Sequence, residues 1–331
     1  MIDHLRGRPE TPRRAEAGRR VRARWRGRPD LRLLCQRVAA EVAMDADADG
    51  LPGWLPRVVA WLPAAGTAAL AAVYVVRSRT FYWLLLEDHP VEWAQFALLV
   101  YSVLVAAFTA VRLARRGSRV ALLLFAVALA AAVLAGEEIS WGERVFSLVP
   151  PLAVSSNNLQ GELTIHNMSI DGVQVDDLSK MVELTLALGA ITLALLTRPA
   201  RGALAGTWLR AVAPPLSTVP PFAFMLGYQV FMIGAGVVAA PALLYQEWAE
   251  AGLYLAIAVT VACCWLRAGA AAPARGRHEH PSRGRRRERG PLAVAALLAL
   301  ALTGVFAQLT AQSAVLPGNV PRSLRSLYGS F

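Results

Sequence analysis

The stretch that decides the fold covers residues 120–146 and reads VALLLFAVALAAAVLAGEEISWGERVF. Its first 17 residues are all apolar or glycine, whereas the residues that follow include three glutamates. At 1.5 Å per helical residue, such a run crosses most of the roughly 30 Å hydrocarbon core of a bilayer. Glu137, Glu138 and Glu143 would then lie beside the membrane, where ionisable groups are costly and are candidates for a functional site.

The composition of the whole chain agrees with this interpretation. Of its 331 residues, 56% are hydrophobic and 17% are charged, with a mean hydropathy of +0.42. In a soluble globular protein roughly a quarter of the residues are charged. We therefore predict an all-α, polytopic transmembrane helix bundle of about seven spans, with six or eight as alternatives. The candidate spans cover residues 58–76, 91–111, 119–136, 181–197, 219–243, 248–266 and 291–311.

The distribution of arginine predicts the orientation of the bundle, because cytoplasmic loops near span ends are enriched in Lys and Arg. With the N-terminus inside, the cytoplasmic segments hold 28 of the 34 basic residues, and every loop agrees with this alternation. We predict the N-terminus inside and the C-terminus outside, in a cell (plasma) membrane such as a bacterial inner membrane. The arginines then serve topology and contact with anionic membrane lipids, and no nucleic acid partner is expected.

Three segments are predicted along the chain. The first, residues 1–57, holds 13 Arg and few large apolar groups, so we expect a mostly disordered, basic cytoplasmic arm, in which Met44 is an alternative start. The others are a transmembrane domain at 58–311, with an outer loop at 147–180 and a basic cytoplasmic loop at 268–290, and a short outer tail at 312–331.

Polar residues of several spans gather at one predicted depth, near the outer interface. Glu137 and Trp141 share a helical face if the third span continues as a helix. Gln308 and Gln312 of the seventh span reach the same level. In the second span, three polar residues follow the i, i+4, i+7 spacing of one helical face. They are Asp88, Glu92 and Gln95, and together these spacings predict an outward-facing polar pocket.

The outer loop contains a second polar motif, NNLQGELTIHN, at residues 157–167. If this segment is helical, Glu162 and His166 are stacked at i, i+4 and can meet one metal ion or one substrate. The Asp171–Gly172 pair instead favours a two-residue hairpin turn. We expect a short helix or re-entrant turn to about Asn167, followed by irregular chain.

Three blocks of the sequence resemble a family of uncharacterised bacterial polytopic membrane proteins, which carry EDxxxE, GEEISWGxRxF and NxQxExxxHN motifs. The resemblance covers mainly residues 81–168. It departs from the family at His89, where glycine is usual, and at Glu143, where glutamine is frequent. It implies a shared site without an assigned activity. The matching residues are Glu87, Asp88, Glu92 and Trp93, then Gly136 to Phe146, then Asn158, Gln160, Glu162, His166 and Asn167.

The first functional hypothesis is an enzyme at the outer leaflet that acts on a lipid or lipid-linked substrate with a divalent cation. Two acids in a low-dielectric site cannot both stay ionised cheaply, so one should bind a proton, an arginine or a metal. Glu137, Glu138, Glu162 and His166 surround a divalent cation or a water. One glutamate is the general base, His166 is a ligand or acid, and Arg144 stabilises developing negative charge. The expected metal ligands are Glu138, Glu162 and His166, and the other pocket residues are Asp88, Glu92, Trp141, Asn158, Gln160, Asn167 and Gln308.

Two other classes of function stay open. A proton- or cation-coupled transporter would exchange ions at the same acids, but it needs a polar path to the inner face, and the deeper parts of the spans are mostly Ala, Leu and Val. A non-catalytic membrane component would bind a lipid or a partner at the outer site. Each residue also has a structural interpretation, in which Glu137 and Glu138 terminate a helix and His166 makes a structural hydrogen bond.

Overall fold

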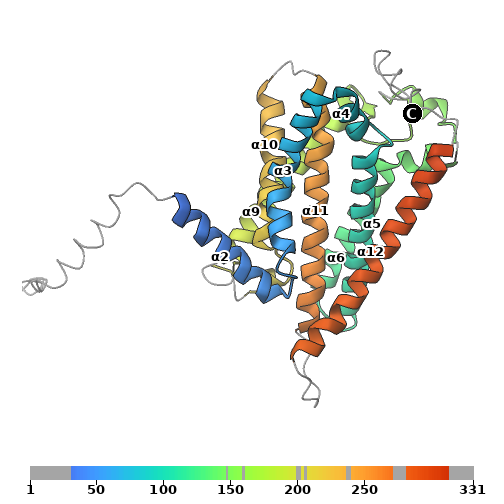
Figure 1. Cartoon of the computed structure of the whole chain (residues 1–331). Coiled ribbons are helices and arrows are strands. Elements are labelled where there is room, and N and C mark those ends of the chain that lie inside the picture. Colours follow the sequence, from blue (N-terminus) through green and yellow to red (C-terminus); the bar gives the residue numbers. More distant parts are fainter. Residues whose placement is uncertain are drawn as a thin grey trace, which may run out of the picture. The chain divides into compact units, whose positions relative to one another are not determined.

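The computed structural model describes residues 31–146, 148–158, 161–198, 203–204, 207–235, 240–270 and 281–312. The chain divides into two units, Met1–Val42 and Ala43–Phe331. The described part of the first unit is the beginning of helix α2 (Leu31–Asp49). The second unit contains the long apolar helices (Figure 1).

Seven candidate spans among the described residues are long and apolar enough to cross a membrane, which confirms the predicted all-α bundle by length and composition. The second span is longer than predicted, because a short helix, α4, precedes its main helix, α5. The helices of the spans are α3 (Leu55–Val76), α4 (Ser78–Leu85), α5 (Pro90–Ala114), α6 (Val120–Glu138), α9 (Val175–Leu196), α10 (Val219–Ala235), α11 (Ala240–Ala270) and α12 (Pro281–Gln312).

Helix α11 is the central helix of the bundle. In its most apolar window 72% of the residues are buried, compared with 11–39% in the other candidate spans. It packs against α3, α5, α10 and α12 (Figure 1). The largest cluster of buried side chains includes Leu99 of α5, Phe222 and Met225 of α10, and Leu253 of α11. These side chains fill the middle of the bundle with apolar atoms.

The segment between α6 and α9 is built from short elements. Strands β1 (Ser169–Ile170) and β2 (Val173–Gln174) form an antiparallel hairpin, in which Ser169 pairs with Gln174. Asp171 and Gly172 connect them with φ of 51° and 81°, as a type I′ hairpin turn requires. The expected helix through Asn167 is wrong, since the described residues 161–168 are irregular. The irregular chain expected after Asn167 is also wrong, because the hairpin turn that Asp171–Gly172 favoured is present there. The other elements are η1 (Ser140–Gly142), α7 (Glu143–Phe146) and α8 (Leu152–Ser155).

A network of buried ion pairs lies at the end of the bundle where α11 ends. Arg210, in the 3₁₀ helix η2 (Trp208–Ala211), contacts Asp45 at 2.6 Å and Asp49 at 2.8 Å, and Arg267 of α11 contacts Asp49 at 2.5 Å. Asp45 is only 1% exposed, and this burial raises the pKa of its carboxyl group, although the Leu216 N–H and Arg210 act in the opposite direction. The network fixes the end of α2 to the bundle.

Two predicted loops are partly helical. We expected residues 1–57 to be mostly disordered, but residues 31–49 form α2 and its last turn makes the ion pairs just described. The sequence signal was weak because α2 mixes apolar and charged residues. The basic loop predicted at 268–290 is also shorter, because α11 extends to Ala270 and α12 begins at Pro281.

Candidate functional site

A polar cavity of about 120 Å³ lies at the end of the bundle where α5 begins and α6 ends. Residues of α9, of the first half of α11 and of the loop 161–168 complete its walls. Nine lining residues are carboxylic acids, and none of the lining residues that the structure describes is lysine or arginine. The acids are Glu87, Glu92, Glu137, Glu138, Glu162, Asp176, Glu183, Glu247 and Glu250, and the others are Leu134, Ser140, Thr164, His166, Ser179, Gln246 and Tyr254.

Glu137 holds the loop 161–168 against the end of α6. Its Oε2 accepts hydrogen bonds from the backbone N–H groups of Ile165, at 2.8 Å, and His166, at 3.0 Å. The same oxygen lies 2.9 Å from Nδ1 of His166. Burial disfavours the charged imidazole, but the hydrogen bond and negative charge of Glu137 outweigh this and raise the pKa of His166. When His166 is protonated, it forms an ion pair with Glu137 at the wall of the cavity.

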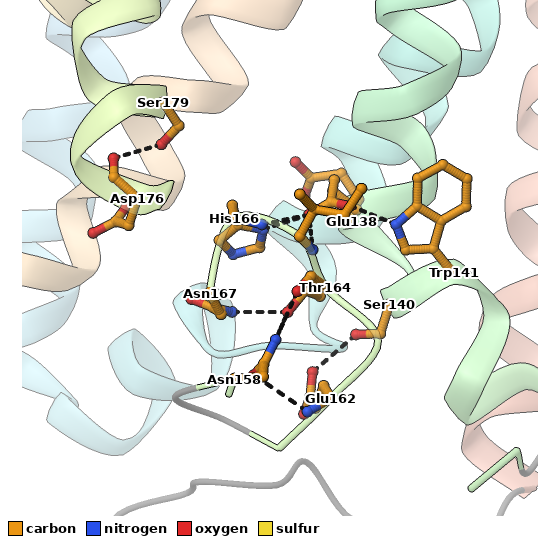
Figure 2. A network of polar contacts seen from close by, with 12 residues as sticks. Glu138, Ser140, Trp141, Asn158, Glu162, Thr164, His166, Asn167, Asp176 and Ser179 are labelled. Carbon is orange, nitrogen blue, oxygen red and sulfur yellow. Dashed lines mark hydrogen bonds and ion pairs between the residues drawn. The ribbon is translucent and has the colours of Figure 1, made fainter. Parts of the chain in front are cut away.

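A sharp turn follows α6 and directs the chain towards the same loop. Ser140, Trp141 and Gly142 all have positive φ, of 46°, 53° and 79°, so α6 cannot continue beyond Ile139 as an α-helix. The indole N–H of Trp141 nevertheless donates to Glu137, so the predicted proximity of these two residues is present without the predicted helix. Ser140 Oγ donates to Glu162 at 2.9 Å (Figure 2).

Two asparagines stabilise the loop 161–168 through hydrogen bonds to Thr164. Asn158 Nδ2 donates to the backbone carbonyl of Thr164 at 2.6 Å, and Asn158 forms a β-bridge with Met168. Asn167 Nδ2 donates to Thr164 Oγ1 at 3.1 Å (Figure 2). Neither asparagine is a lining residue of the cavity. We therefore interpret both as residues that shape the loop.

The deeper acids come from helices that are far apart in sequence, and each has a neutral hydrogen-bond partner. Tyr254 donates to Glu138 at 3.1 Å, and Gln246 donates to Glu250 at 2.8 Å. Two further pairs join neighbouring helices. Gln229 of α10 donates to Glu183 of α9 at 2.6 Å, and Gln95 of α5 lies 3.3 Å from the carboxylate of Glu247 in α11.

Glu183, Glu247 and Glu250 were missed by the sequence interpretation. Each lies inside a candidate span, where an acid is by default a functional hypothesis. We treated Gln246 and Glu247 as a break between two spans, whereas α11 continues through them. At 1.5 Å per residue, Glu183 and Glu250 lie roughly 12–15 Å from the beginnings of their helices. Acids within an otherwise apolar span were the signal that could have identified them.

The two glutamines beside the cavity each have an unsatisfied oxygen. The side chains of Gln95 and Gln229 are 0% exposed, and in the described part of the chain their Oε1 atoms have no hydrogen-bond partner. A buried acceptor without a donor costs roughly 1–3 kcal/mol. Together with the nine carboxyl groups, these two oxygens make the surroundings of the cavity rich in acceptors. The cavity therefore fits a ligand that carries positive charge and donates hydrogen bonds.

The remaining predicted site residues either do not line the cavity or lie outside the described residues. Asp88 is not a lining residue, and its backbone N–H donates to the Glu92 carboxylate, which does line the cavity. Trp141 contacts Glu137 but is not a lining residue, and Gln308 is exposed on α12. The side chain of Arg144 and all of Gln160 lie outside the described residues.

The predicted metal ligands are not gathered around one point. Glu138, Glu162 and His166 all line the cavity, but their hydrogen bonds go to Tyr254, Ser140 and Glu137. Within the described ranges, no group of three His, Cys, Asp or Glu residues has an arrangement that could hold a metal ion.

No protein-family model, curated protein or solved structure matches this chain. The assignment of the site therefore rests on its own geometry.

Proposed function

We propose that this multi-pass membrane protein binds a small ammonium-bearing ligand in the acidic cavity. The observation that carries the proposal is the lining of nine carboxyl groups without a described lysine or arginine among them. Two like charges 4 Å apart repel by about 1–4 kcal/mol at effective dielectric constants of 80 to 20. Several such repulsions would be comparable to the whole stability of a domain, about 5–15 kcal/mol. Lys180 already pairs with Asp176 at 2.5 Å, and the acids that stay ionised are stabilised by a bound cation.

An organic ammonium group matches the arrangement better than a metal ion. A metal needs several ligands at about 2.0–2.6 Å from one point, and the described His, Cys, Asp and Glu residues form no such group. An ammonium group has up to three N–H donors, which can reach acceptors on different walls. Carboxylates from α6, α9 and α11, together with Gln246, supply such acceptors.

The proposal includes chemistry at the membrane face rather than transport across it. His166, held by Glu137, is the acid–base residue in this proposal, and Glu137 is its positioning residue. Beyond the cavity, Leu99, Met225 and Leu253 are at most 2% exposed and belong to an apolar cluster. This packing favours a closed pocket over a polar path through the bundle. The resemblance of three sequence blocks to one membrane-protein family stays part of the proposal, because those blocks supply Glu92, Glu137 and Glu162.

The test is thermal unfolding and calorimetry of the purified protein in nanodiscs, with ethylamine and putrescine compared with magnesium, calcium and zinc chloride. The amines should bind saturably, and a ligand at a hundred times its Kd should stabilise the protein by about 2.7 kcal/mol. Hydrogen bonds to charged groups contribute about 1.5–3 kcal/mol, so Glu250→Gln should weaken amine binding by roughly ten- to a hundredfold.

Asp177→Asn is the matched control. Asp177 adjoins the lining residue Asp176 but is exposed and does not line the cavity, so its neutralisation should leave amine binding unchanged. If both variants lost the same amount of amine affinity, the effect would come from general surface charge, which would contradict the proposal. Saturable binding of a divalent cation without binding of amines would replace the ammonium ligand by a metal.

A further inference from the structure

We propose that the ligand is amphiphilic, an amine-bearing lipid whose hydrocarbon chain lies in an apolar groove between α3, α10 and α11 while its ammonium group enters the acidic cavity. This inference rests on the proposed function and names the substrate class of the same site.

The groove has a volume of about 440 Å³ and lies on the three helices, where it borders the first two turns of α11. Phe224, Phe231 and Tyr245 form much of its wall. The three hydroxyl groups in the wall already have acceptors: Thr67 donates to Pro63, Tyr228 to Leu243 and Tyr245 to Thr67. The groove therefore offers an occupant an apolar surface and no unsatisfied hydroxyl group.

The shape of the groove suits one hydrocarbon chain. Its wall on α10 runs from Ala223 to Phe231, which at 1.5 Å per residue is about 12 Å. One leaflet contributes about half of the roughly 30 Å hydrocarbon core. Gly227 lies within this wall, and a Cβ atom added there would meet nothing within 4 Å. The missing side chain thus leaves open space at this point of the wall, and the wall spans most of the depth of one leaflet.

The groove and the cavity border neighbouring residues of α10 and α11. In α10, Tyr228 lines the groove, and the next residue, Gln229, donates to Glu183 in the wall of the cavity. In α11, Tyr245 lines the groove, and the next residue, Gln246, lines the cavity. Figure 1 shows α3, α10 and α11 side by side. In the proposed complex, one molecule with a cationic end and an apolar end passes between α10 and α11 and occupies both spaces.

Charge complementarity identifies the occupant among membrane lipids. Any acyl chain suits the groove, but an anionic headgroup would be repelled by the ionised acids of the cavity. A lipid with an ammonium headgroup places its chain in the groove and its positive charge in the cavity, so both contacts contribute to its affinity. For a soluble amine that binds from water, each CH₂ group buried in the groove contributes about 0.8 kcal/mol, so its affinity should rise with chain length.

The experiment uses the full chain in phosphatidylcholine nanodiscs and a series of ethylamine, butylamine and octylamine, with partition into empty nanodiscs subtracted. We expect affinity to rise at least tenfold from ethylamine to octylamine. Gly227→Leu fills the groove, so it should abolish this gain while leaving the affinity for ethylamine unchanged. Gly234→Leu is the matched control, because Gly234 lies in the same helix with open space around it and outside the groove.

The outcomes separate the two proposals. If ethylamine binds and Glu250→Gln weakens it, but chain length and Gly227→Leu have no effect, the cavity takes a free amine and the lipid inference is overturned. If no amine binds, the proposed function itself fails. If octan-1-ol binds as tightly as octylamine and is also displaced by Gly227→Leu, the groove takes chains without selecting an ammonium group, which contradicts the inference.

Discussion

The charge on His166 controls how firmly the loop 161–168 is held at the wall of the cavity. Glu137 of α6, Glu250 of α11 and Asp176 of α9 all favour the protonated imidazole, and together they outweigh burial and raise its pKa above 6.5. Because the folded-state pKa is raised, the stabilisation is complete below the unfolded pKa and is lost as the pH rises through the folded value. The loop should therefore loosen towards alkaline pH.

We predict that this loosening appears in amide hydrogen exchange. Protection of the Ile165 and His166 amides, which donate to Glu137, should fall as the pH rises above about 6.5, after correction for the intrinsic pH dependence of exchange. A His166→Gln variant keeps a polar side chain but cannot titrate, so its protection should be independent of pH over the same range. If the wild-type loop shows constant protection, the ion pair does not hold it.

The turn after α6 is the element that positions the site. Three successive left-handed residues from Ser140 to Gly142 follow the end of α6, and a side chain adopts this conformation at a cost of about 1–2 kcal/mol per residue. Two hydrogen bonds to the loop offset this cost. Ser140 Oγ donates to Glu162, and the Leu163 N–H donates to Glu143 at 2.9 Å. The turn and the loop 161–168 therefore stabilise each other.

Gly142→Ala tests this coupling. Gly142 has φ of 79°, and an added Cβ would lie 2.8 Å from the ring of Phe146, so we expect a loss of at least about 1–2 kcal/mol in unfolding free energy. The measurement is unfolding followed by tryptophan fluorescence. Gly189→Ala in α9 meets nothing within 4 Å and should be neutral or stabilising by up to about 1 kcal/mol. Similar effects of the two substitutions would argue against a required left-handed residue.

The helical spans could be predicted from the sequence, whereas the turn that positions the site could not. Apolar runs identify the spans, because length and hydropathy suffice for a segment that must satisfy its backbone within a membrane. The turn at Ser140 and Trp141 was not predictable, since neither residue type favours positive φ and only tertiary contacts impose it. The sequence likewise does not predict that Glu183 and Glu250 line the same cavity as Glu137 and Glu138. Their proximity depends on how α9 and α11 pack around the cavity with α6.

At the scale of the whole molecule, the two ends of the bundle carry different kinds of charge. One end has the cavity with nine acids, whereas the other has arginines paired with acids. Arg112 contacts Glu288 at 2.6 Å, and Arg267 contacts Asp49 at 2.5 Å. These contacts join segments that the distribution of arginine assigns to one side of the membrane. The bundle therefore fits the predicted alternation, and its direction in the membrane is a separate, testable prediction.

Native cysteines allow that direction to be measured. Cys35 is exposed, whereas Cys263 and Cys264 are buried in α11, so a membrane-impermeant maleimide should report on Cys35 alone among them. With the N-terminus inside, Cys35 should be labelled only after sealed cells are permeabilised. In a Cys35→Ser background, Ile170→Cys places an exposed thiol in the hairpin near the acidic cavity, and it should be labelled in intact cells. The opposite pattern would place the cavity at the inner leaflet.

The orientation also decides the source of the lipid. Because the groove on α10 and α11 adjoins the cavity, a cavity at the inner leaflet would take its amine-bearing lipid from that leaflet. The labelling therefore decides which leaflet supplies the site.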